Sequence, residues 1–292
     1  MSSLVIPGEE KQDYKTECRV CAHRCRLSEG QTGFCRARAC RKGEIVSISY
    51  GRLTALALDP IEKKPLKRFY PGSRILSAGS FGCNLSCPFC QNYEISTAGL
   101  RQVQWRQTEP EELVELALEM RPKGNIGLAF TYNEPLIGYE FVRDCARLAQ
   151  QKGLKSVAVT NGSVSPEILE EILPYIDAFN VDLKGFTEAF YEKINGNLEI
   201  VKEFIRKASE RSHVEVTTLV IPGENDTEEE IRELAAWLGA VSPDIPLHLS
   251  RFFPRFHMKD RKATEVSKIY RLAEAAGQYL KYVYPGNCQG GV

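Results

Sequence analysis

The chain has no surplus of charge of either sign and no long apolar run. Its 292 residues include 38 lysines plus arginines and 38 aspartates plus glutamates, so the formal net charge is zero. A neutral chain offers no overall electrostatic attraction for nucleic acid. No segment approaches the ~18 consecutive apolar residues typical of a membrane-spanning helix. The sequence also has no internal repeat and no low-complexity tract.

The N-terminus lacks the basic region and apolar stretch of a secretion signal. Ten cysteines are present, and seven of them fall into two tight clusters rather than being spread along the chain as in a disulfide framework. Clustered cysteines without a secretion signal favour metal binding over disulfides. We therefore expect a reducing cytoplasm, with little oxygen.

The second cluster, Cys83, Cys87 and Cys90, has the spacing C-x3-C-x2-C. Thiolates are soft ligands that suit iron–sulfur clusters or zinc. An ordinary four-iron cluster takes four cysteines. Three closely spaced cysteines without a fourth nearby indicate that one iron stays open, as in reactive metal sites. A zinc knuckle or unrelated thiols are the alternatives.

The first cluster contains four cysteines, Cys18, Cys21, Cys25 and Cys35. Four thiolates complete a tetrahedral zinc site, and the same number can hold a second iron–sulfur cluster. We favour zinc, with free buried thiols as the alternative. His23 is a further candidate ligand. The arginines around this cluster would suit nucleic acid or the negative charge of a metal–thiolate centre, but no interleaved aromatic residues support base stacking.

From residue 74 onward the sequence alternates between apolar strands and amphipathic helices. The expected strands are 74–80, 126–131, 155–160, 178–183, 214–221 and 247–252, and the expected helices are 109–121, 136–152, 165–174, 187–194, 198–211, 227–240 and 264–280. Six such β–α units predict an α/β fold with a parallel sheet, either doubly wound or a barrel. The residues after the first strand are no Gly-rich phosphate loop, which disfavours the doubly wound form. We divide the chain into a cysteine-rich segment, 1–70, and an α/β domain, 71–292.

Polar residues follow every predicted strand. The cysteine cluster follows the first strand, Glu134 the second, Asn161 the third, and Asp182 with Lys184 the fourth. Because parallel strands end at one face of a barrel, we expect these groups to meet there. Some of these residues would serve as turns or helix caps instead.

The cysteine spacing resembles the signature of the radical S-adenosylmethionine (SAM) superfamily. Nearly the whole chain is similar to the AmmeMemoRadiSam-system family within it, which resembles the activating enzymes of pyruvate formate-lyase. The motifs that carry this resemblance are Cys18-Arg19-Val20-Cys21, Gly33-Phe34-Cys35, 59–66, 81–92, 131–135, 181–184 and 250–254.

The resemblance implies a partial, six-unit TIM-type barrel and a 4Fe-4S cluster on Cys83, Cys87 and Cys90 whose open iron binds SAM. It places Phe89 near the adenine and a motif after the second strand at the SAM amine. Here Tyr132-Asn133-Glu134 stands where relatives commonly have Gly-Gly-Glu. The expected SAM-binding residues are therefore Thr131, Asn133, Glu134, Asn161, Asp182 and Lys184.

The implied chemistry is cleavage of SAM to a 5′-deoxyadenosyl radical that abstracts hydrogen from an unknown substrate. Reduced flavodoxin or ferredoxin would supply the electron, and Memo-like or AMMECR1-like proteins are candidate partners by association. His248 and Arg251, on the last predicted strand, are candidate substrate contacts or structural residues of the barrel wall. The rival functions are a glycyl-radical enzyme activase, a non-catalytic metal-binding scaffold and a zinc-dependent nucleic-acid binder.

Overall fold

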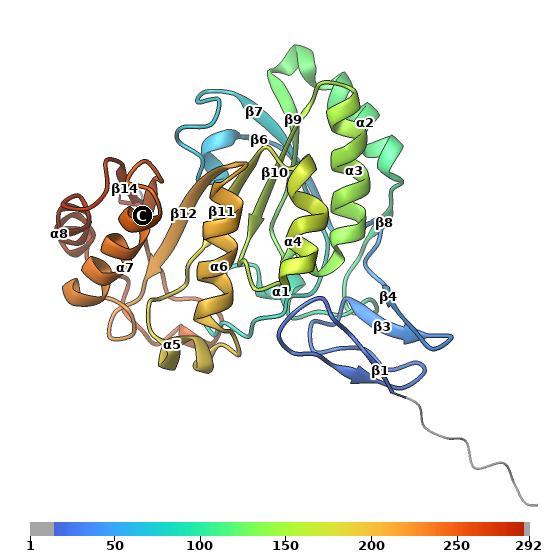
Figure 1. Cartoon of the computed structure of the whole chain (residues 1–292), viewed down its shortest axis with the longest axis horizontal. Helices are drawn as coiled ribbons and strands as arrows, with labels where there is room; N and C mark the ends of the chain where they lie inside the picture. The colour runs from blue at the N-terminus through green and yellow to red at the C-terminus, as the bar shows by residue number, and fades with distance from the viewer. Residues whose placement is uncertain (1–14, 289–292) are drawn as a thin grey trace, which may run out of the picture.

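The computed structural model of the protein describes residues 15–288 and is built around one eight-stranded sheet (Figure 1). The strand order is β14-β13-β12-β11-β10-β9-β7-β6. All pairs from β7 to β14 are parallel, whereas β6 pairs antiparallel with β7. The strands are β6 (Ala55–Pro60), β7 (Arg74–Gly79), β9 (Asn125–Phe130), β10 (Lys155–Thr160), β11 (Ala178–Asp182), β12 (His213–Val220), β13 (Leu247–Arg251) and β14 (Val283–Gly286).

Helices connect the parallel strands and cover the sheet, as Figure 1 shows for α2, α3, α4 and α6. On α3, the buried residues include Phe141, Cys145 and Ala149, which recur every four positions and form one apolar face. The helices are α1 (Tyr93–Ser96), α2 (Pro110–Glu119), α3 (Tyr139–Gln151), α4 (Pro166–Ile172), α5 (Glu188–Lys193), α6 (Leu198–Ser209), α7 (Glu228–Val241) and α8 (Val266–Ala276). Short 3-10 helices lie at Ile61–Lys63, Arg121–Lys123, Pro135–Gly138, Leu173–Tyr175 and Phe256–Met258. Within residues 15–288, none of the helices combines the length and the apolar character that a membrane span requires.

The predicted α/β fold is confirmed, and each of the six expected strands is present, with its ends at the expected residue or one residue away. Two strands of the sheet were not predicted. β14 is a seventh parallel strand beyond the six expected units, and its Pro285 and Gly286 are residues uncommon within strands. β6 ends at Pro60, and three of its six residues are exposed, so its short apolar run Ala55–Leu58 does not follow the burial of a core strand. Because β6 lies within residues 1–70, the sheet takes one strand from the range assigned to the cysteine-rich segment.

The chain between β6 and β7 contacts side chains of β11 and β12. The carbonyl of Pro65 accepts a hydrogen bond from Asn180 Nδ2 on β11 at 2.9 Å. The backbone amides of Lys67 and Arg68 donate to the carboxylate of Glu215 on β12 at 3.0 and 2.8 Å. This segment, residues 61–70, therefore lies against the inward-facing side chains of the sheet.

The N-terminal module, residues 15–47, contains β1 (Thr16–Glu17), β2 (Arg26–Leu27), β3 (Arg38–Arg41) and β4 (Glu44–Ser47), and lies at the lower end of the view in Figure 1. A further pair, β5 (Arg52–Leu53) with β8 (Arg106–Gln107), follows it in the chain. The buried Arg38 guanidinium makes two hydrogen bonds to the Glu140 carboxylate at the start of α3, at 2.7 and 2.9 Å. Ser165, before α4, donates to the carbonyls of Arg19 and Val20. These contacts dock the module on the edge where the parallel strands end.

Candidate functional site

A cavity of about 850 Å³ opens where the parallel strands end. This volume is at the upper end of the range for a pocket that holds a single small ligand. The cysteine loop, residues 80–92, forms one side of the cavity, and the 61–67 segment and β14 form another. The predicted site residues that line it are Cys83, Cys87, Phe89, Cys90, Thr131, Asn133, Glu134, Asn161, Asp182, Lys184 and His248. Residues from five separate parts of the sequence thus share one space.

The cysteine loop leaves β7 through two close approaches. A side chain at Gly82, whose φ is +85°, would come within 2.3 Å of the Cys35 carbonyl in the N-terminal module. A side chain at Gly79 would come within 2.7 Å of the Tyr132 ring. Glycine at both positions therefore lets the loop pass between the module and the β9 end, and directs Cys83, Cys87 and Cys90 to the cavity.

The thiols of the cysteine loop affect one another's ionisation. Burial raises the pKa of Cys83 well above its ordinary value, and the Glu134 carboxylate and the other two thiols add to the effect. Burial also raises the pKa of Cys87 to about 12, although the Lys184 ammonium opposes the rise. A soft metal centre would relieve this cost by taking the thiolates as ligands.

The donor set therefore fits an iron–sulfur cluster chemically. Within residues 15–288, however, no three Cys, His, Asp or Glu side chains are already arranged to hold a single metal ion. The fit rests on three soft ligands that face one cavity, not on a preformed ligand geometry.

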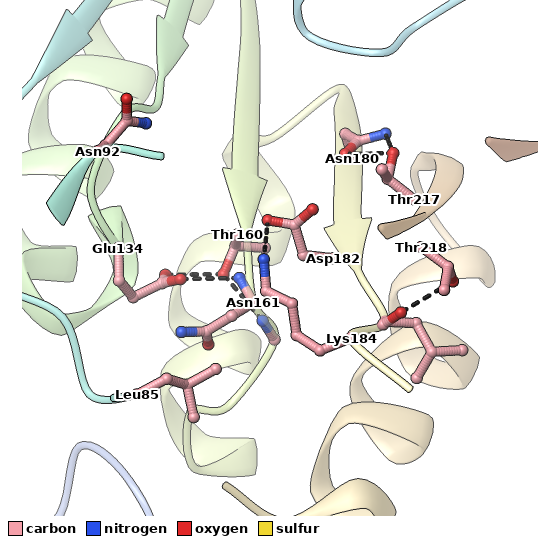
Figure 2. A network of polar contacts seen from close by, with 12 residues as sticks. Leu85, Asn92, Glu134, Thr160, Asn161, Asn180, Asp182, Lys184, Thr217 and Thr218 are labelled. Carbon is pink, nitrogen blue, oxygen red and sulfur yellow. Dashed lines mark hydrogen bonds and ion pairs between the residues drawn. The ribbon is translucent and has the colours of Figure 1, made fainter. Parts of the chain in front are cut away.

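Glu134 is the most connected acidic group of the cavity (Figure 2). Its side chain is only 3% exposed. Its Oε1 accepts hydrogen bonds from Leu136 N at 2.9 Å and Thr160 Oγ1 at 2.7 Å, and its Oε2 accepts from Asn161 N at 2.7 Å. Burial raises the pKa of Glu134 to about 7 despite these donors, and the Asp182 carboxylate adds to the rise. Among the described residues no cation pairs with it, so an incoming ammonium group would supply the missing charge.

Two predicted residues before Glu134, Thr131 and Asn133, both border the cavity, but Asn133 also binds the cysteine loop. Thr131 is buried and lines the cavity. The Asn133 side chain accepts from Ser80 N and donates to the carbonyls of Phe81 and Gly82, so it holds the start of the cysteine loop. The predicted contact between Asn133 and SAM would therefore be made by an amide that already forms these three hydrogen bonds.

Asp182, the last residue of β11, and Lys184 form an ion pair of 2.7 Å, and Figure 2 shows it beside Thr160. Burial alone would lower the pKa of Lys184, but the Asp182 carboxylate and the Cys87 thiol together raise it above its ordinary value. Lys184 is therefore a cation at any physiological pH. Its charge lies near the cysteine loop, where it favours thiolates.

The remaining predicted residues differ in their placement. Phe89 is buried against Phe190, with ring centroids 6.1 Å apart, and still borders the cavity. His248 borders it too, and its Nε2 lies 2.6 Å from Glu215 Oε2. Arg251 is not among the lining residues. Its Nε donates to the carbonyl of Thr264 at 2.6 Å, so in this structure Arg251 holds the segment before α8.

The four N-terminal cysteines all lie in the module. Cys18, Cys21 and Cys35 are buried and Cys25 is partly buried. Burial raises the pKa of Cys21 to about 11, and the thiols of Cys35 and Cys18 contribute. His23, the further candidate ligand, instead contacts the cysteine loop: its Nε2 lies 2.7 Å from the carbonyl of Asn84.

Asn84, which the sequence analysis did not single out, joins the module to the cavity. Its Nδ2 donates to the carbonyl of Ser163 at 2.7 Å, and its Oδ1 accepts from Asn161 Nδ2 at 2.9 Å. The same Asn161 amide lies 3.7 Å from Cys83 Sγ. The module, the cysteine loop and the β10 end therefore share one buried set of hydrogen bonds. The only signal in the sequence is that Asn84 directly follows Cys83.

Residues 79–238, more than half of the chain, match the family described as the Radical SAM superfamily. This range begins at the last residue of β7 and ends within α7, so it contains the cysteine loop, Glu134, Asn161 and the Asp182–Lys184 pair.

Curated relatives match over half of the chain or more. An uncharacterized protein of Methanocaldococcus jannaschii is 36% identical over 286 residues, which cover 97% of this chain and 84% of the relative. The pyruvate formate-lyase-activating enzyme of Clostridium pasteurianum is 28% identical over 160 residues, and the pyruvate formate-lyase 1-activating enzyme of Escherichia coli is 26% identical over 172. These matches cover 53% and 56% of this chain, and 65% and 68% of the two enzymes.

Solved structures show a similar fold. A radical SAM methyltransferase from Sphaerobacter thermophilus aligns with a TM-score of 0.57 at 17% identity, over 74% of this chain and 67% of that one. Streptococcus suis SuiB bound to S-adenosylmethionine aligns with a TM-score of 0.56 at 13% identity, over 70% and 47%.

The raised pKa of Glu134 predicts a pH dependence of stability. The carboxyl titrates near 4.5 when unfolded and at about 7 when folded, so the folded state binds the proton more tightly. In the protein without added ligands, the contribution of Glu134 to the free energy of unfolding is then fully present below pH 4.5 and is lost as the pH rises through 7. Glu134→Gln, which stays neutral, should gain about 2–3 kcal/mol relative to wild type between pH 5 and pH 8 in denaturant unfolding.

Glu192→Gln is the matched control, because it removes an exposed carboxylate on α5. It should show no such gain. Parallel pH profiles for wild type and Glu134→Gln would contradict the buried charge at this site.

Proposed function

The chain belongs to the radical SAM superfamily, and on that premise we propose that it holds a 4Fe-4S cluster on Cys83, Cys87 and Cys90 and cleaves SAM beside it. The observation that carries the proposal is that these three thiols and the unpaired, buried Glu134 carboxylate line one cavity. When bound, the cluster and SAM supply one electron and a 5′-deoxyadenosyl radical, which abstracts hydrogen from a substrate.

The chain's own residues would bind and orient SAM. Glu134 accepts hydrogen bonds only from neutral donors, so it suits the SAM amine. Lys184 suits the SAM carboxylate, and Asp182 suits the ribose hydroxyls. The Phe89 ring offers an apolar surface for the adenine. Thr131 and the Asn161 side chain border the same space.

Asn133 and Asn84 would act by holding the loop. Their amides fix the backbone at Ser80–Gly82 and around Ser163, so the three thiols keep their places while ligands enter and leave. Hydrogen-bonded supports of this kind restrict a site to one geometry.

We also propose a subfamily, protein partners and an electron donor for this chain. The motifs support the AmmeMemoRadiSam-system family, with Memo-like or AMMECR1-like proteins as partners and reduced flavodoxin or ferredoxin as electron donor, in the cytoplasm. The similarity to pyruvate formate-lyase-activating enzymes supports a second candidate, formation of a glycyl radical on a partner protein. A glycyl-radical signal on the partner would distinguish the two.

We further propose a structural metal in the N-terminal module, held by Cys18, Cys21, Cys25 and Cys35, with zinc favoured over a second cluster. The module is small, Cys18, Cys21 and Cys35 are buried in it, and Cys25 is partly buried. Four thiolates satisfy tetrahedral zinc, which would stabilise a segment with few apolar residues of its own.

Cys87→Ala should lose SAM cleavage. The variant keeps two of three ligands, so reconstitution under anaerobic conditions should leave no stable cluster absorption and 5′-deoxyadenosine formation at background. Cys145→Ala, which removes a buried thiol on α3 far from the cavity motifs, should retain both. Undiminished 5′-deoxyadenosine from Cys87→Ala would refute the ligand assignment.

Aerobically purified protein should keep about one zinc per chain after the oxygen-sensitive cluster is lost. Metal analysis of Cys21→Ser should show that zinc gone, while Cys40→Ser, a buried thiol outside the four, keeps it. Iron in place of zinc at this site would show that the four cysteines hold a second iron–sulfur cluster. Absence of metal, with all four thiols open to alkylation in folded protein, would contradict a metal in the module.

A further inference from the structure

The part of the cavity away from the cysteine loop has its own polar groups. It is bordered by Lys63 and Lys67 from the 61–67 segment, by His248 on β13, and by Tyr284 on β14. None of these residues has a role in the proposed SAM site. A cavity of about 850 Å³ leaves room for a second ligand beside SAM.

A buried carboxylate organises this region. Glu215 on β12 is 0% exposed and accepts four hydrogen bonds. Two come from the amides of Lys67 and Arg68, at 3.0 and 2.8 Å, and two from the Nε2 atoms of His213 and His248, at 2.9 and 2.6 Å. Burial alone would raise the pKa of Glu215, but the four donors together lower it to about 2. Glu215 is therefore an anion that fixes both the backbone of Lys67 and the ring of His248.

The orientation of His248 follows from this bond. A carboxylate only accepts, so His248 must carry a proton on Nε2. Its Nδ1 has no hydrogen-bond partner among residues 15–288, although the residue is only 5% exposed and borders the cavity. In this tautomer Nδ1 is an acceptor, so it can accept a hydrogen bond from a hydroxyl or N–H group of a ligand in the cavity.

The lysines that border the cavity differ in whether their ammonium groups form ion pairs. Lys184 pairs with Asp182 at 2.7 Å, and Lys63 lies 3.6 Å from Asp59. Lys67 has no carboxylate within ion-pair distance in the described part of the chain, because Glu215 binds its backbone amide and not its ammonium. The acidic residue of the same segment, Glu62, accepts from Gly72 N at 2.7 Å.

We propose that this region binds an anionic group of the substrate, a carboxylate or a phosphate, through the Lys67 ammonium, and that His248 Nδ1 accepts a hydrogen bond from a neighbouring hydroxyl or N–H group of the same substrate. The inference rests on the proposed function, since it places the substrate in the cavity that holds SAM. The anion would lie against the 61–67 segment, and the rest of the substrate would extend toward the SAM half of the cavity. Tyr284, whose ring centroid is 5.3 Å from that of His248, borders the same space.

The test is calorimetric titration of the reconstituted, SAM-loaded protein with inorganic phosphate and, separately, with succinate. At least one anion should bind to the wild type, and the arm that binds identifies the group as phosphate or carboxylate. Lys67→Gln should weaken that binding at least tenfold. Lys67 is exposed, so this variant should fold.

Lys259→Gln is the matched control, because it removes an exposed positive charge outside the cavity, and it should bind the anion as wild type does. Binding of neither anion to wild type, or equal binding to Lys67→Gln and wild type, would overturn the inference. The same wild-type preparation is assayed for 5′-deoxyadenosine after reduction with dithionite. SAM cleavage without anion binding rejects only this inference, whereas no SAM cleavage rejects the proposed function.

Discussion

The carboxylate of Glu134 joins two segments of chain at the point where β9 and β10 end. It caps the 3-10 helix through Leu136 N, accepts from the Thr160 hydroxyl, and accepts from the amide of Asn161. Burying a carboxylate is costly unless donors or a cation compensate for the lost water. Here the donors are neutral, so the compensation is partial and the pKa of Glu134 rises to about 7. The site is thus built around a group that a bound ammonium would stabilise.

The second constraint is the position of the cysteine loop. Glycine at position 82 is required because the loop backbone passes against Cys35 of the N-terminal module. Asn84 then connects the module, through its contact with His23, to Asn161 and Ser163. The two cysteine clusters are therefore mechanically linked. A metal that orders the module would also order the loop that carries Cys83, Cys87 and Cys90.

Much of this site could be predicted because its signals are local in the sequence. The C-x3-C-x2-C spacing and the polar residue after each apolar strand are visible without a structure, and the cavity brings these residues together. The roles of Glu215 and Arg38 could not be predicted. Glu215 binds Lys67 across 148 positions, and Arg38 binds Glu140 across 102. Such pairs depend on how elements pack, as does the position of Arg251, whose neighbour Ser250 borders the cavity while Arg251 does not. β14 was missed because its proline and glycine weaken the strand pattern.

The central claim is that SAM binds the cluster within this cavity, with its amine at Glu134. Electron–nuclear double resonance on the reduced, SAM-loaded protein tests it most directly, with nitrogen-15 in the amino group of SAM. The account predicts a nitrogen-15 signal from an amine held close to the cluster, and a smaller population of that bound form in Glu134→Gln. A spectrum that does not change when the label is introduced would contradict the account.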